Sequence, residues 1–263
     1  MLELNYPGIF AGYSCHNHSD WSDGADTLAD MCRAGKNSGL RVMGISDHWV
    51  EPPYDAMDSE SWSMDLHRLD DYVSELQRLK RELDDENFTL KIGLEVDFFF
   101  ENIDAVLARL RDYPLDYLIG SVHYAGLFPV DHIIDEWLPL SEEEKESICE
   151  IYWQKLAGAA AVEEFDFIGH LDLPKKFGLI DNSRYLPHAA KVLDIIQQHG
   201  GAIELNTAGY FKECQEPYPS SAMLRLAQER RIPVIVSADA HSASCVQRSF
   251  DEARELLKCA GYK

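Results

Sequence analysis

Basic residues are scarce in this chain compared with acidic ones. Its 263 residues include 24 Lys and Arg against 46 Asp and Glu, which gives a formal net charge of -22 at pH 7. Because nucleic-acid backbones are bound chiefly through Lys and Arg, this charge argues against a partner that is a long nucleic acid. An anionic ligand would need strong local positive charge, from metal ions or a few placed basic side chains, to bind at all.

Long apolar runs and paired cysteine motifs are also missing. No apolar stretch approaches the roughly 18 residues of a membrane span, and the first residues carry neither a basic nor an apolar leader segment. The six cysteines lie far apart and form no C-x-x-C pair, which favours reduced thiols. We therefore expect a cytoplasmic protein that has no membrane partner.

The chain has no low-complexity segment, fixed-period repeat or Pro/Gly/Ser-rich linker, so we expect one domain over residues 1–263. Short apolar strands are predicted at 13–18, 41–48, 90–98, 116–124, 166–172, 202–207 and 233–241. Helices are predicted between and after them at 26–38, 64–85, 102–112, 141–164, 185–199, 219–230 and 244–260. Ser141 and Glu144 have the spacing of a capping box. About seven strand–helix units favour an α/β fold whose parallel sheet is a closed or nearly closed barrel.

Histidines and carboxylates gather at the ends of the predicted strands. In chain order they are His16, His18, Asp47, His48, Glu95, Asp97, His123, His170, Asp172, Glu204, Asn206, Asp239 and His241. The carboxyl ends of barrel strands open onto one face, where ligand sites are built. One histidine at such an end is more often structural than functional, but independent structural roles would not place six of the ten histidines there. Imidazole and carboxylate ligands suit Zn, Fe or Mn, and their number predicts two or three divalent ions.

Short motifs around these residues closely resemble those of the polymerase and histidinol phosphatase (PHP) superfamily. They are HNH at 16–18, DG at 23–24, SDH at 46–48, GLE at 93–95, GSVH at 120–123, IGH at 168–170 and SADAH at 237–241. The motifs follow one another in the same order and span nearly the whole chain. The resemblance implies a distorted, TIM-like (β/α)7 barrel with a trinuclear metal centre at the carboxyl ends of the strands, which agrees with the strand pattern.

Carried over motif by motif, the resemblance implies three sets of metal ligands. The first ion would be held by His16, His18, Glu95 and Asp239. The second would share Glu95 as a bridge and be held by His123 and His170, and the third would be held by Asp23, His48 and His241. Asp20 and Asp47 match no ligand position. We expect Asp20 to lie in a turn or to support a ligand, and Asp47 to orient its neighbour or close the loop.

The middle of the chain is most similar to the histidinol-phosphate phosphatase branch of the superfamily, through the stretches GSVHYAGLFPVD, GHLDLPKKFG and IELNTAGYFKECQEPYPS. This similarity implies hydrolysis of a small phosphorylated metabolite, first of all L-histidinol phosphate, by attack of a metal-bound hydroxide on phosphorus. The candidate catalytic residues are Glu95, Asp239 and His241. The candidate substrate contacts are Lys175, Lys176, Asn206 and Lys212.

One departure from the family pattern leaves the organic part of the substrate open. Where the family usually has a basic residue soon after the glycine of the NTAG stretch, this chain has Tyr210 and Phe211 before Lys212. Sugar phosphates and nucleotides are therefore alternative substrates. A nuclease and an inactive metal-binding module are alternatives of other classes, opposed by the acidic charge and by the complete ligand set respectively. The sequence leaves open the oligomeric state, the identity of the metal, and whether Asp239, His241 or a metal-bound water protonates the leaving oxygen.

Overall fold

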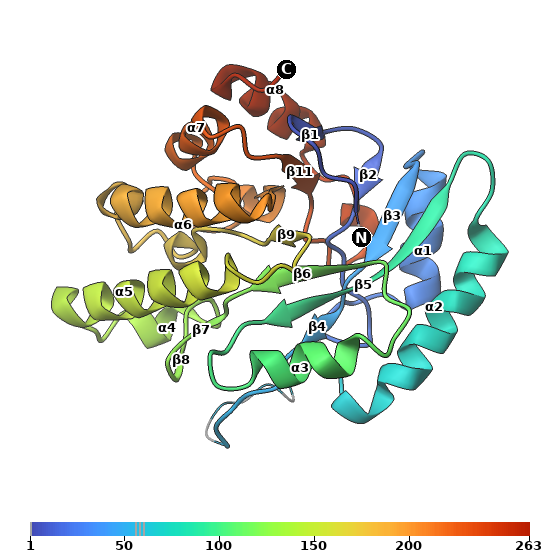
Figure 1. The fold of residues 1–263 in the computed structure, drawn as a ribbon, viewed down its shortest axis with the longest axis horizontal. Coiled ribbons are helices and arrows are strands. Elements are labelled where there is room, and N and C mark those ends of the chain that lie inside the picture. Colours follow the sequence, from blue (N-terminus) through green and yellow to red (C-terminus); the bar gives the residue numbers. More distant parts are fainter. Residues whose placement is uncertain (1, 56, 58, 60) are drawn as a thin grey trace.

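The computed structural model describes residues 2–55, 57, 59 and 61–263, and its strands are surrounded by helices (Figure 1). The strands are β1 (Gly8–Ile9), β2 (Tyr13–Ser14), β3 (Val42–Ile45), β4 (His48–Trp49), β5 (Thr89–Asp97), β6 (Tyr117–Ser121), β7 (Tyr124–Ala125), β8 (Phe128–Pro129), β9 (Phe167–Ile168), β10 (Ile203–Asn206) and β11 (Val234–Ser237). The α-helices are α1 (Leu28–Asn37), α2 (Leu69–Leu83), α3 (Ile103–Leu110), α4 (Ile134–Trp137), α5 (Glu142–Ala159), α6 (Leu186–His199), α7 (Ser221–Glu229) and α8 (Phe250–Ala260). The 3₁₀ helices are η1 (Leu66–Arg68), η2 (Leu173–Lys175), η3 (Asn182–Tyr185), η4 (Thr207–Phe211) and η5 (Ala243–Cys245).

One parallel sheet of nine strands runs in the order β1-β11-β10-β9-β6-β5-β3-β2, with β4 paired to β5. The two edges of this order meet beyond the carboxyl ends of β2 and β11. There Asn17 forms a parallel bridge with Ala240, and the His18 amide donates to the Ala240 carbonyl at 2.8 Å. β1 and β2 thus act as two parts of a first strand, and the expected distorted barrel is confirmed.

Several predicted strands are too long at their carboxyl ends. The predicted strand 166–172 is limited to Phe167–Ile168, and 233–241 to Val234–Ser237. Past the strand ends some backbone amides donate to carboxylates, although others, such as that of Gly169, still donate to a neighbouring carbonyl. The amide of His170 donates to Glu204 at 2.9 Å, and that of His123 donates to Asp97 at 2.9 Å. The barrel strands therefore give way to side-chain-supported loops where the polar residues begin. The prediction also missed β1 and the β7–β8 hairpin.

The helices pack their apolar faces against the outside of the sheet. In α2 the buried residues Leu69, Tyr72, Leu76, Leu79 and Leu83 recur every three or four positions, as expected for one helical face. At α5 the predicted capping box is present, because the Glu144 amide donates to Ser141 Oγ and the Ser141 amide to Glu144 Oε2. Among the helices described, none is long and apolar enough to cross a bilayer.

The barrel interior is filled by a small apolar cluster that is separate from the larger core under the helices. Its bulkiest members are Tyr117 of β6 and Phe167 of β9. A Cβ atom at Gly44 or Gly93 would come within 2.2 Å or 2.3 Å of the Tyr117 side chain, so both positions need glycine. The Tyr117 hydroxyl donates to the carbonyl of Cys15 at 2.8 Å. This plug closes the barrel below the polar residues at its carboxyl end.

Candidate metal centre

Glu95 lies near the end of β5 and is the centre of the polar cluster. Only 1% of the residue is exposed. Its Oε2 atom lies 3.2 Å from Nε2 of His16, 3.5 Å from Nε2 of His18 and 2.8 Å from Nδ1 of His48. His16 and His18 follow β2 and His48 begins β4, so the HNH and SDH motifs lie on one side of the carboxylate.

The other oxygen of Glu95 faces the opposite side of the barrel. Oε1 lies 2.8 Å from Nε2 of His170 and 3.7 Å from Nε2 of His123. It also accepts a hydrogen bond from Ser121 Oγ at 2.6 Å. One buried carboxylate therefore stands between two separate groups of imidazoles, as a bridging ligand would.

Asp239, just past β11, approaches the same histidines as the first Glu95 oxygen. Its Oδ1 lies 3.2 Å from Nε2 of His18 and 3.6 Å from Nε2 of His16. Its φ of 50° places the backbone in the left-handed region, and Asn206 holds the second oxygen with an amide donor at 3.1 Å. The strained backbone thus turns this carboxylate into the cluster.

Asp23 forms the outer part of the cluster. Its oxygens lie 3.2 Å from Nε2 of His241 and 3.6 Å from Nε2 of His48, and its side chain is 31% exposed. The structure thus brings all nine predicted ligand residues to one mouth. Three groups of these atoms are spaced closely enough to hold an ion: His18, Asp23, His48 and His241; His16, His18 and Glu95; and His48, Glu95 and His123.

The cluster contains buried nitrogen and oxygen atoms that could ligate a metal and that form no hydrogen bond with any described residue. They include both ring nitrogens of His18, Nε2 of His16, Nδ1 of His48 and Oε2 of Glu95. Buried polar atoms are rarely left in this state. Nitrogen and oxygen ligands of one tetrahedral ion lie about 3.4 Å apart when each bond is near 2.1 Å, close to the separations above. The donor set therefore fits more than one divalent metal ion.

The pKa shifts of Glu95 and His18 suit metal ligation. At four other histidines burial opposes protonation, but neighbouring carboxylates outweigh it and raise the pKa: His16, His123, His170 and His241. Burial opposes ionisation of Glu95, but the neighbouring imidazoles, His16 foremost, outweigh it and hold the pKa of Glu95 well below its ordinary value. Burial, reinforced by the imidazoles of His48 and His241, lowers the pKa of His18 to about 3. A metal site needs ionised carboxylates and neutral imidazoles, and these two residues are held in those forms.

Two buried carboxylates outside the predicted ligand set support its histidines. Glu204 in β10 accepts from Nδ1 of His16 at 2.7 Å, and Asp97 lies 3.4 Å from Nδ1 of His123. Such partners orient metal-ligating imidazoles and raise their basicity. The sequence places both residues at strand ends but assigns them no role; the signal was a carboxylate inside an otherwise apolar strand.

Asp47 closes the loop that follows His18, as expected from the sequence. It is fully buried and accepts from the Ser19 amide and hydroxyl at 2.7 Å each and from Ser22 Oγ at 2.5 Å. Asp20 is an exposed turn residue in this loop. The loop brings Asp23 back over the mouth to His48 and His241. Residues from three separate segments of the chain therefore belong to one group of possible metal ligands.

The predicted substrate contacts differ in their surroundings. Lys175 is 3% exposed, and its Nζ lies 3.1 Å from Asp172 and donates to the Pro217 carbonyl at 2.7 Å. Lys176 pairs with Asp131 at 3.1 Å. Asn206 is fully buried and its amide is shared between Glu204 and Asp239.

Lys212 is exposed at the end of η4. Of the four candidates, three are therefore engaged with other groups of the protein.

Trp62 forms an aromatic wall beside the cluster that the sequence did not indicate. Its ring makes edge contacts with His48 and His123, with centroid distances of 4.8 Å and 5.3 Å. The residue lies between β4 and η1, in a segment with no motif or regular element, so only the tertiary contact points to it. It lies directly beside two of the predicted ligands, His48 and His123.

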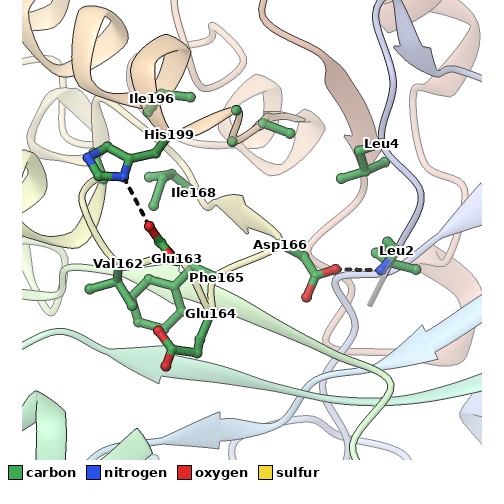
Figure 2. A pocket seen from close by; sticks show the side chains of 14 residues that line it. Leu2, Leu4, Val162, Glu163, Glu164, Phe165, Asp166, Ile168, Ile196 and His199 are labelled. Atoms are coloured by element: carbon green, nitrogen blue, oxygen red, sulfur yellow. Dashed lines mark hydrogen bonds and ion pairs between the residues drawn. The ribbon is translucent and has the colours of Figure 1, made fainter.

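A cavity of about 200 Å³ lies elsewhere, beside the end of α6 (Figure 2). It is lined by Leu2 and Leu4 of the N-terminal segment, the connection from α5 to β9, and the end of α6. Glu163 and His199 face each other across it at 3.9 Å. No predicted site residue is among the described residues that line it, so this cavity is separate from the cluster.

Comparisons with known proteins agree with this geometry. The chain is 35% identical to the "Probable histidinol-phosphatase" of Deinococcus radiodurans over 89% of this chain and 88% of that protein. It is 25% identical to the histidinol-phosphatase of Bacillus subtilis over 86% of this chain and 91% of that protein. A histidinol phosphate phosphatase structure from Lactococcus lactis, complexed with Zn, L-histidinol and phosphate, superposes with a TM-score of 0.80 at 21% identity, over 95% of this chain and 94% of that one. The PHP domain family matches residues 14–208, and the chain therefore belongs to the PHP domain family.

Proposed function

We propose that this protein is a metal-dependent phosphomonoesterase whose substrate is L-histidinol phosphate. The observation that carries the proposal is the buried cluster around Glu95, with its two groups of imidazoles and its unsatisfied ligand atoms. The names of the relatives from Deinococcus radiodurans and Bacillus subtilis support the substrate. Zn, L-histidinol and phosphate in the Lactococcus lactis structure support the metal and the ligand class.

We assign the ions to nine residues: His16, His18, Asp23, His48, Glu95, His123, His170, Asp239 and His241. When bound, divalent ions supply charge neutralisation at the phosphoryl oxygens and activation of water. In an acidic protein this local charge is what admits an anionic substrate to the mouth.

The position of each residue in the cluster then indicates its proposed role. Glu95 links the two groups of imidazoles, while Glu204 and Asp97 hold the rings of His16 and His123 in orientation. Asp239 and His241 lie on the accessible side, with 16% and 40% of their side chains exposed. The leaving oxygen of the substrate would meet the protein on that side. We therefore assign its protonation to the side where Asp239 and His241 lie.

We also propose that residues 1–263 act as one unit in the cytoplasm. The family match ends at residue 208, but β11, Asp239 and His241 lie beyond it and complete the barrel and the cluster. All six cysteines are in the described part of the chain and are free thiols, which supports a reducing compartment.

The test is phosphate release by the full chain loaded with Zn, Mn or Fe. Substrates are L-histidinol phosphate, several sugar phosphates, nucleoside monophosphates and a short single-stranded oligonucleotide. We expect a strong preference for L-histidinol phosphate that is lost in Glu95→Ala and His123→Ala. Preference for another small ester would change the proposed substrate but leave the proposed phosphomonoesterase activity standing. Cleavage of the oligonucleotide alone would favour a nuclease. Hydrolysis of none of them by metal-loaded protein would overturn the proposal.

A further inference from the structure

Positive charge near the mouth is mostly neutralised by the protein itself. Lys175 and Lys176 are paired with Asp172 and Asp131, each at 3.1 Å. Lys175 is also buried and donates to a carbonyl. To reach a substrate, either lysine would have to break an ion pair, and for Lys175 this leaves the buried carboxylate of Asp172 without its cation. Another cation is better placed to receive an anionic group.

Arg248 is anchored close to the cluster although it lies beyond its motifs. It follows η5 on the segment that leads from His241 to α8. Its carbonyl accepts from Thr207 Oγ1 at 2.7 Å, and Thr207 is the residue after Asn206, whose amide is 3.1 Å from Asp239 Oδ2. The backbone of Arg248 is thus joined through two short steps to a predicted ligand.

The surroundings of Cys245 place the Arg248 charge on the same side as His241. Burial raises the pKa of this thiol, but hydrogen bonds to Ser242 and Ser244 and the positive charges of Arg248 and His241 outweigh it and lower the pKa. Both cationic side chains therefore act on one thiol. The position of Arg248 at the carboxyl end of the barrel follows from its backbone contact with Thr207, and the effect of its charge on Cys245 agrees with that position.

The guanidinium of Arg248 is oriented but not satisfied. It lies over the ring of Phe211 at 3.9 Å from the centroid. Its Nε is buried without a hydrogen-bond partner, and the described residues offer it no carboxylate in an ion pair. The ring covers one face of the guanidinium, and its N–H groups form no hydrogen bond with the described residues. The planar edge of a guanidinium matches the oxygens of a phosphoryl group.

We propose that Arg248, held by Phe211, binds the phosphoryl group of the substrate at the rim of the metal cluster. The inference deepens the proposed function and rests on it for the identity of the anion. Phe211 is a positioning residue, because it acts through the guanidinium that it stacks against. The two residues come from different loops, after β10 and after β11, so the contact exists only in the folded barrel.

Two readouts on the Zn-loaded full chain test the proposal: the KM and kcat for L-histidinol phosphate, and the affinity for inorganic phosphate by calorimetry. Arg248→Gln is expected to raise KM and weaken phosphate binding by about 10- to 100-fold, as for loss of a charged hydrogen bond, with a smaller change in kcat. Arg248→Lys should lie between, because it keeps the charge without the planar edge.

Arg231→Gln is the matched control. Arg231 also stacks on an aromatic ring, that of Tyr6, at 4.6 Å, but it precedes β11 and so lies at the other end of the barrel. This variant loses the same charge and the same kind of contact and is expected to match wild type in both readouts.

Phe211→Ala tests the positioning role without changing any charge. We expect it to raise KM about 2- to 5-fold, the size of an exposed cation–π contact, and Phe211→Tyr to restore the wild-type value. If Arg248→Gln fails to fold, Arg248→Lys and the Phe211 pair decide the question.

The outcomes separate the inference from the proposed function. Wild-type hydrolysis with unchanged KM and phosphate affinity in the Arg248 variants would overturn the inference and leave the phosphatase intact. A wild type that hydrolyses no phosphomonoester, yet binds phosphate in an Arg248-dependent way, would overturn the function and leave the anion site. Phosphate binding that does not depend on Arg248 would overturn the proposed role of Arg248, whether or not the protein hydrolyses a phosphomonoester.

Discussion

Both ends of the barrel contain carboxylates that take part in its structure, half-buried Asp116 at the amino end and buried Glu95 at the carboxyl end, but the two are used differently. At the amino end, Asp116 accepts from the Ile92 amide at 2.9 Å and from Lys80 Nζ at 3.0 Å. At the carboxyl end, Glu95 faces imidazoles and leaves Oε2 without a hydrogen bond among the described residues. Asp116 therefore satisfies a backbone amide and pairs with a lysine. Glu95, in contrast, keeps an oxygen atom for which the described residues supply no hydrogen-bond donor.

This difference separates a structural acid from a candidate ligand more reliably than burial does. Asp166, before β9, is also half-buried, and its oxygens accept from the amides of Leu118 and Leu2. Asp47 is fully buried at the carboxyl end and is likewise satisfied, by Ser19 and Ser22. The informative property is therefore an unsatisfied ligand atom beside several others, and substitutions at the two ends should have opposite consequences.

The largest effect is expected at Glu95. Glu95→Gln keeps the shape of the side chain but removes the charge between the two groups of imidazoles, so kcat/KM should fall on the order of 10³-fold. The measurement is steady-state hydrolysis of L-histidinol phosphate together with metal content after dialysis. Full activity with a full complement of metal would contradict the assignment of Glu95.

Metal addition should stabilise the wild type and not this variant. Binding to the folded state alone adds about 2.7 kcal/mol to the free energy of unfolding at a free metal concentration 100 times Kd. Urea unfolding with EDTA and with buffered Zn gives the difference, and Glu95→Gln serves as the control. Equal stabilisation of both proteins would place the bound metal elsewhere.

Glu204→Gln should have a smaller effect because Glu204 acts through His16. Loss of the carboxylate at 2.7 Å from Nδ1 leaves the ring in place but weakens its orientation and basicity, for which a 10- to 100-fold loss of metal affinity or activity is typical, about 1.4–2.7 kcal/mol. Restoration of the rate by excess Zn would confirm that the loss is in metal binding. Wild-type behaviour at limiting Zn would rule out the role.

Asp116→Asn should do the reverse of Glu95→Gln. We expect the free energy of unfolding to fall by about 1 kcal/mol, because an ionised acceptor of a strand amide and a lysine is lost, while kcat/KM stays at the wild-type value. Urea denaturation and the hydrolysis assay measure the two quantities. A loss of activity without a loss of stability would break the comparison between the two ends.

The smallest effect is the pH dependence of that stability difference. Burial opposes ionisation of Asp116, but the Ile92 amide and Lys80 outweigh it and lower the pKa. A lowered pKa in the folded state means that the stabilisation is present above the ordinary value near 3.8 and is lost as pH falls through the folded value. The difference between wild type and Asp116→Asn should therefore be constant near neutral pH and shrink in acid. A difference that grows in acid would contradict this sign.

Much of this organisation was predictable because it depends on local pattern. Alternating strands and helices predicted the barrel, and the position of each histidine at a strand end predicted a common mouth. The capping box of α5 was also correct, since all its partners lie within four residues. Strand ends were less accurate, because a backbone amide such as that of His170 bonds to a carboxylate 34 residues away.

The sequence by itself determined the barrel class, the family and which side chains could bind metal, since each follows from residue type and order along the chain. The tertiary structure decided which of these groups are already satisfied. Lys175 and Lys176 are predicted contacts by sequence but engage carboxylates in the fold, whereas Arg248 meets Phe211 from another loop. The type of each residue determines its charge and hydrogen-bonding capacity. Which partner a side chain meets depends on distances that are set only when the barrel closes.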